Sequence, residues 1–117
     1  MKENKVRGTE YIVRRLKEMG FTVDQKNEHM ICAYISENMQ FVEQYGYRYY
    51  KGTTIEIEET YRSNGTADNV NINLMVTKWD VTTGRRVQKP LKVRMDARES
   101  LKEKRVQSIV ALYEENK

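Results

Sequence analysis

Tyrosines alternate with basic residues between positions 45 and 52, where the chain reads YGYRYYKG. If this stretch is a strand, Tyr47 and Tyr49 lie on one face, because side chains alternate between the two faces of a sheet. Aromatic rings placed in this way can stack on nucleobases while neighbouring cations contact phosphates. Two other interpretations stay open, namely packing of some rings in the core and a protein-binding surface, where tyrosine and arginine are enriched.

A second group of candidate residues is basic and lies towards the C-terminal end. Residues 78–105 contain ten basic and four acidic side chains, a net charge of +6, whereas the whole chain carries +4. Such a concentration is typical of a surface for a polyanion, although cations on an edge strand also prevent sheets from joining edge to edge. The candidate phosphate contacts, which we call the basic band, are Arg85, Arg86, Lys89, Lys92, Arg94 and Arg98.

The chain has one histidine and one cysteine. His29 is the candidate for catalysis, because an imidazole titrates near neutral pH and can act as an acid or a base; beside a turn, it also fits an ordinary surface residue. Cys32 lies in an apolar run, so we expect a buried free thiol. One Cys and one His cannot complete a zinc site, and no phosphate-cradling glycine motif is present. We therefore expect no metal and no cofactor.

Most of the chain has clear patterns that predict the elements carrying these residues. Apolar residues at helical spacing predict helices over residues 6–19 and 97–115, and Asp96-Ala97-Arg98-Glu99 has the spacing of a capping box. Residues 36–46 fit either a short helix or a strand. Alternating polar and apolar residues predict strands over residues 21–25, 29–36, 53–62, 69–81 and 87–95.

These elements predict one α+β domain, an antiparallel sheet of four to five strands flanked by an N-terminal and a C-terminal helix. Each element has an apolar face that only the others can cover, so we expect one common core. Its predicted members are Val13, Leu16, Ile31, Ile57, Ile72, Leu74, Val93, Ile109 and Val110.

Two stretches resemble the HicA-type toxins, small RNA-cleaving proteins with a fold similar to the double-stranded-RNA-binding domain. Within residues 16–31 the chain reads LKEMGF and then KNEHMI; within residues 91–109 it reads LKVRM, ESLK and VQSI. In that family a helix ends in Gly-Phe, and the catalytic histidine follows a turn, usually after Gly-Ser. The resemblance therefore implies this topology and an RNA-cleaving role for His29. Asn27-Glu28 stands where the family has Gly-Ser, and residues 36–86 have no counterpart in its compact members.

The leading hypothesis from the sequence is a small cytoplasmic protein that binds RNA or single-stranded nucleic acid without cleaving it. The basic band would contact phosphates, and Tyr47 and Tyr49 would stack on bases. The alternative is an interaction or inhibitor protein, such as a phage or mobile-element factor that blocks a host protein. A degenerate HicA-like nuclease is the third hypothesis. No apolar run approaches the length of a membrane span, so we expect no membrane partner; the oligomeric state stays open.

Overall fold

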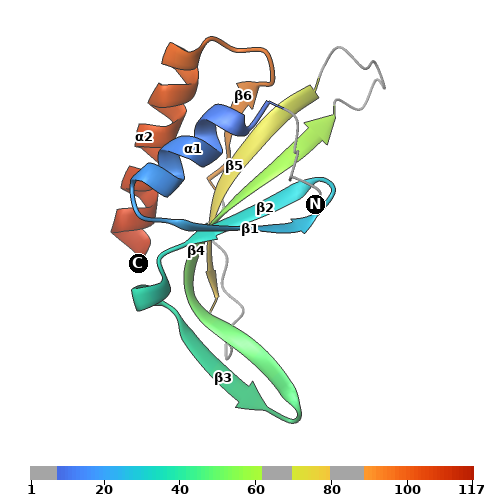
Figure 1. Ribbon diagram of the computed structural model, residues 1–117, viewed down its shortest axis with the longest axis vertical. Helices are drawn as coiled ribbons and strands as arrows, with labels where there is room; N and C mark the ends of the chain where they lie inside the picture. Colours follow the sequence, from blue (N-terminus) through green and yellow to red (C-terminus); the bar gives the residue numbers. More distant parts are fainter. Residues whose placement is uncertain (1–7, 62–69, 80–88) are drawn as a thin grey trace.

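The computed structural model describes the backbone of residues 8–61, 70–79 and 89–117, and the side chains of these residues except 41–42, 47–50, 61, 70 and 79. The predicted α+β class, with an antiparallel sheet and a helix near each end, is confirmed (Figure 1). The elements are α1 (Glu10–Glu18), β1 (Thr22–Asn27), β2 (Met30–Tyr34), the 3-10 helix η1 (Ser36–Asn38), β3 (Gln40–Gln44), β4 (Tyr47–Tyr61), β5 (Val70–Trp79), β6 (Leu91–Arg94) and α2 (Glu99–Asn116).

Five strands form one antiparallel sheet in the order β1-β2-β4-β5-β6, and β3 pairs with β4 off this path. The register aligns apolar residues across the sheet. Ile31 of β2 lies opposite Ile57 of β4, and Ile57 lies opposite Leu74 of β5. Leu74 in turn pairs with Leu91 of β6. Because directly opposed residues share a face, this row makes one face of the sheet apolar.

Both helices cover this apolar face, with α1 beside β1 and α2 across β4, β5 and β6 (Figure 1). Ile12 and Leu16 of α1 and Ile109 of α2 are fully buried in a single core with the inward residues of the strands. Seven of the predicted core residues are buried, whereas Val13 and Val110 pack on the core and stay partly exposed. The spacing of apolar residues therefore places the helices correctly.

The start of α2 differs from the prediction. Its N-cap is Arg98, and no side chain caps the helix, so the predicted capping box with Asp96 as the cap is wrong. The carboxylate of Asp96 instead accepts hydrogen bonds from Arg94, whose Nε and Nη2 lie 3.1 and 3.0 Å from its two oxygens. A charge-assisted pair with two hydrogen bonds competes with capping for the same oxygens.

The last strand is shorter than predicted. β6 begins at Leu91, directly after Pro90, because proline has no N–H to donate to a strand ladder. The predicted helix residues 6–7 and the predicted strand residues 62, 69, 80–81 and 87–88 lie outside the described residues.

Residues 36–46 contain both a helical turn and a strand, and they lead into a hairpin. η1 is followed by β3, and Tyr45 and Gly46 close the turn to β4 with φ angles of 54° and 80°. β3 pairs with residues 47–51 of β4, whereas β4 pairs with β5 from Gly52 onwards. We call β3, the turn and residues 47–51 the arm. It extends away from both helices (Figure 1).

The arm joins the body of the protein at a glycine. Gly52 has a φ of 145°, and a Cβ atom there would lie 2.5 Å from Sδ of Met39 and 2.9 Å from the carbonyl oxygen of Asn38. Both the backbone conformation and the close approach of η1 require the absence of a side chain. One residue thus fixes the path of β4 between arm and body.

Candidate nucleic-acid interface

The described part of the basic band lies at the outer edge of the sheet. Lys92 and Arg94 are exposed on β6 and alternate with Val93, which is buried under the helices. They therefore occupy the face of the sheet opposite the helices. Lys89 and Arg98 are exposed on either side of β6, whereas Arg85 and Arg86 lie outside the described residues.

One cation of the basic band has an acidic partner. The two hydrogen bonds from Arg94 to Asp96 also form an ion pair, in which both side chains are about two-thirds exposed. An exposed pair of this kind adds little stability, but it lowers the net positive charge that Arg94 offers to a phosphate. Lys89, Lys92 and Arg98 are the other described members of the basic band.

The tyrosine positions lie at the opposite end of the sheet from Arg94. Arg94 pairs with Asn71 of β5, and Asn71 pairs with Thr60 of β4. Thr60 and Tyr49 are eleven positions apart on the same strand, which corresponds to roughly 35 Å at about 3.3 Å per residue. The fold therefore does not bring Arg94 and the tyrosines into one site.

Tyr45 lies at the tip of the arm rather than in a strand. Its side chain is 85% exposed, and its φ of 54° places it in the left-handed region. Turns with two positive φ angles favour Asn, Asp or Gly at the first central position, and a bulky residue there is uncommon. The turn geometry therefore places the side chain of Tyr45 at the exposed tip of the arm.

Two lysines that are not among the predicted site residues lie next to the tyrosine positions. Lys51 is two positions beyond Tyr49, and the same alternation continues to Thr53. Thr53 pairs directly with Lys78 of β5, so Lys51, Thr53 and Lys78 share a face at the base of the arm. Lys51 is half-buried and Lys78 is exposed. The sequence does contain a signal for this grouping. The alternation that places Ile57 on one face of β4 also assigns Lys51 and both tyrosines to that face.

The part of β4 that directly follows the arm contacts the C-terminal end of α2. The hydroxyl of Thr53 donates a hydrogen bond of 2.8 Å to the carbonyl oxygen of Asn116. The adjacent Lys117 is exposed and forms an ion pair of 2.7 Å with Glu114. The body next to the arm is therefore tied to the end of a helix, whereas Tyr45 at the tip of the arm is exposed.

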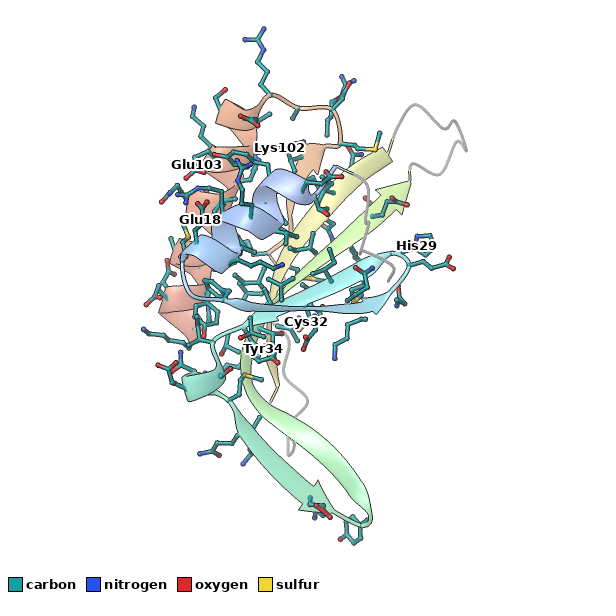
Figure 2. All side chains as sticks on the ribbon, viewed as in Figure 1. Glu18, His29, Cys32, Tyr34, Lys102 and Glu103 are labelled. Atoms are coloured by element: carbon teal, nitrogen blue, oxygen red, sulfur yellow. The ribbon has the colours of Figure 1, made fainter. Side chains whose placement is uncertain are left out.

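A cluster of charged residues joins α1 to α2 and stabilises their packing. Glu103 of α2 accepts hydrogen bonds from the Tyr11 hydroxyl at 2.6 Å, Arg15 Nε at 2.8 Å and Gln107 Nε2 at 2.6 Å. These contacts, with that from Arg15 the strongest, lower the pKa of Glu103 to about 2, and the same contact raises the pKa of Arg15. Glu103 and Glu18, which share Arg15, lie on neighbouring helices (Figure 2).

Replacing Glu103 by Gln is expected to lower the free energy of unfolding at neutral pH, and the loss should shrink in acid. The folded-state pKa is about 2 and the ordinary value is 4.5. The stabilisation by the carboxylate is therefore complete above about pH 4.5 and disappears as the pH falls towards 2. Urea midpoints of the two proteins should converge over this range. A constant difference would contradict the assignment, and Glu114→Gln, which removes an exposed pair, serves as the control.

His29 lies in the turn between β1 and β2. Its backbone N–H donates to Oδ1 of Asn27 at 2.8 Å, and its backbone carbonyl oxygen accepts a hydrogen bond of 3.0 Å from the backbone N–H of Glu59. Its Nδ1 is 3.4 Å from Oε1 of Glu59; the side chain of His29 is 59% exposed and that of Glu59 is 5% exposed. Glu59 therefore contacts His29 through both its backbone and its side chain. Figure 2 shows His29 away from Lys102 and Glu103.

Cys32 is buried on β2, as expected. Burial raises the pKa of its thiol, which disfavours the reactive thiolate. In residues 8–61, 70–79 and 89–117, no group of His, Cys, Asp and Glu side chains is arranged to hold a metal ion. The geometry of the described residues thus gives no support to thiol or metal chemistry.

The arm and its base are the candidate interface that the structure adds to the basic band.

Neither described helix has the length and apolar character required to span a membrane. Comparison with protein-family models, curated proteins and solved structures gives no match for this chain.

Proposed function

We propose that this protein binds single-stranded nucleic acid, RNA or DNA, along the arm. The observation that carries the proposal is the register of β4, in which Tyr47, Tyr49 and Lys51 occupy alternate positions of one strand that leaves the body. Alternate positions are about 6.6 Å apart, which gives each ring a separate base. Lys51 and Lys78 would contact the phosphates beside the stacked bases.

The tip of the arm supports the same interpretation. Tyr45 is 85% exposed, so its ring can stack on a further base without rearrangement of the protein. Base stacking on aromatic side chains tolerates any sequence, because every base has a π face. The proposed binding is therefore insensitive to sequence.

The basic band has a different part in this proposal. Its described members lie at the far end of the sheet, so they would attract the polyanion over a distance or bind a second segment of a long strand. We place the protein in the cytoplasm, where single-stranded RNA is present and a lone buried cysteine stays reduced.

Fluorescence anisotropy with a labelled single-stranded oligonucleotide at low salt tests the stacking step. Tyr47→Ala is expected to weaken binding by roughly 1–3 kcal/mol, the usual contribution of one stacked base. Tyr47→Phe keeps the ring and should bind like the wild type. Absence of binding to RNA and single-stranded DNA, or equal affinity of Tyr47→Ala and wild type, would overturn the proposal and favour a protein partner.

The salt dependence of the same assay separates the arm from the basic band. Removing both Lys51 and Lys78 as Lys→Gln should reduce the slope of log affinity against log salt by roughly 1.4, because each phosphate contact on a single strand contributes about 0.7. The exposed Lys104→Gln on α2 is the matched control and should leave the slope unchanged. Arg85→Ala with Arg86→Ala should weaken binding to all sequences alike.

Recovery of the RNA after the assay tests the third hypothesis. We expect the RNA to stay intact, because Asn27-Glu28 stands before His29 where the HicA-type toxins have Gly-Ser. Metal-independent cleavage that is lost in His29→Ala would instead support a nuclease.

A further inference from the structure

β3 has one strand edge without a described partner. It pairs with β4 along one side through five residue pairs, from Gln40 with Lys51 to Gln44 with Tyr47. In the part of the chain that the structure describes, no strand pairs with its other side. An edge strand presents a row of unpaired N–H and C=O groups that can pair with another chain.

The body of the protein protects both of its own edges. β1, at one edge, has an irregularity between Gln25 and Asn27, and such bulges disturb pairing with a further strand. β6, at the other edge, is four residues long, follows Pro90 and carries exposed Lys92 and Arg94. Short strands, prolines and cations are the usual means of blocking edge-to-edge pairing.

β3 is also short, at five residues, but it has fewer of these protective features. Its sequence QFVEQ contains no proline, glycine or lysine, and its one charged residue is Glu43, which lies opposite Arg48 of β4 in the strand register. A hairpin of only two strands is also marginally stable in water. A less protected edge on a two-stranded arm is therefore a place where another strand adds stability.

We propose that β3 pairs antiparallel with β3 of a second copy of this chain, with the two-fold axis at Val42. In this register Gln40 faces Gln44 of the second copy, Phe41 faces Glu43, and Val42 faces its own equivalent. All five residues are paired, and the two Glu43 carboxylates do not face each other. This pairing matches glutamine with glutamine and valine with valine and places no like charges directly opposite each other, which favours a second copy, and the interface closes as a symmetric dimer.

The dimer joins the two arms into a four-stranded sheet in the order β4-β3-β3-β4. Three or more strands are the number at which sheets become independently stable. The arm extends away from both helices, so the pairing strands belong to the part of each copy that projects from the body (Figure 1). The contact is small for a protein interface, so the dimer is reversible and depends on concentration. This inference does not depend on nucleic-acid binding.

A charge-exchange experiment tests the register. One variant carries Gln40→Lys and Gln44→Lys, and the other carries Gln40→Glu and Gln44→Glu. Both glutamines are exposed. Gln40 lies opposite Lys51 within the arm, so the lysine variant also adds one like-charge pair to its own hairpin. Recovery of the dimer in the mixture would show that this variant still forms the arm. In the proposed dimer, positions 40 and 44 of the two copies face each other twice. Each variant alone then places like charges opposite each other, whereas a mixture of the two pairs opposite charges.

Sedimentation velocity on samples free of nucleic acid gives the readout. The wild type should shift from the 13.9 kDa monomer towards twice that mass as its concentration rises. Each charged variant alone should stay monomeric, and the equimolar mixture should form the dimer again. Ser100→Lys with Ser108→Lys adds the same charge on the exposed surface of α2 and should dimerise like the wild type. A wild type that stays monomeric up to near-millimolar concentration, or charged variants that dimerise alone, would overturn the proposal.

Discussion

Tyr113→Ala is expected to lower the free energy of unfolding by roughly 3–5 kcal/mol, the usual cost of removing a large buried ring. Tyr113 is fully buried on α2, and its ring meets that of Phe21 edge-on, with the centroids 5.1 Å apart. Its hydroxyl accepts a hydrogen bond of 3.0 Å from Nδ2 of Asn38 in η1. One ring therefore connects α2, the link between α1 and β1, and the segment that leads into the arm.

The matched control is Tyr113→Phe, which keeps the ring and removes only the hydroxyl. Because Asn38 is exposed and can bond to water instead, this variant should lose at most about 1 kcal/mol. Urea denaturation followed by circular dichroism measures both changes. A Tyr113→Ala midpoint equal to that of the wild type would show that α2 is not anchored at its C-terminal end.

Ile109→Ala should lower the free energy of unfolding by roughly 2–5 kcal/mol, through lost burial and the cavity that remains. Ile109 is fully buried in the middle of α2, in the same core cluster as Ile72 and Leu74 of β5. Its exposed neighbour gives the control, since Ser108→Ala changes no buried surface and should have little effect. An unchanged midpoint in Ile109→Ala would mean that α2 does not pack on the sheet.

The sequence predicted the core well because burial follows residue spacing. The alternation around Ile55 and Ile57, and the helical spacing of Leu16 and Ile109, put each residue on the face where the structure buries it. These patterns are local, and each amphipathic element has one apolar face that is buried away from water. Fold class could therefore be predicted without any knowledge of which strands are neighbours.

The arm could not be predicted in the same way. Alternation continues on both sides of Gly52, so the pattern does not show that β4 leaves the helix-covered body at this residue. The capping box failed for a related reason, since the partner of Asp96 is a side chain on the neighbouring strand rather than the helix N-terminus. Both errors concern competition between partners, which spacing alone does not resolve.

The candidate site was only partly accessible from the sequence. Tyr47 and Tyr49 were identified by their type and spacing, but they were grouped with a basic band whose described residues lie on β6 and beside it. Strand register separates Arg94 from Tyr49 and brings Lys78 to the base of the arm instead. Such proximity depends on pairing between distant segments.

β4 extends through two regions whose backbone amides should exchange hydrogen with solvent by different routes. Residues 55–58 have hydrogen-bonded strands on both sides, β2 and β5, so their slowest amides should exchange only when the whole domain unfolds. Residues 47–51 pair with β3 alone among the described strands, so local opening of the arm is sufficient to expose their amides. Amide exchange along this one strand should therefore give two different free energies of opening, and the change between them should occur at Gly52. Ile109→Ala should speed exchange in the first region and leave the second nearly unchanged.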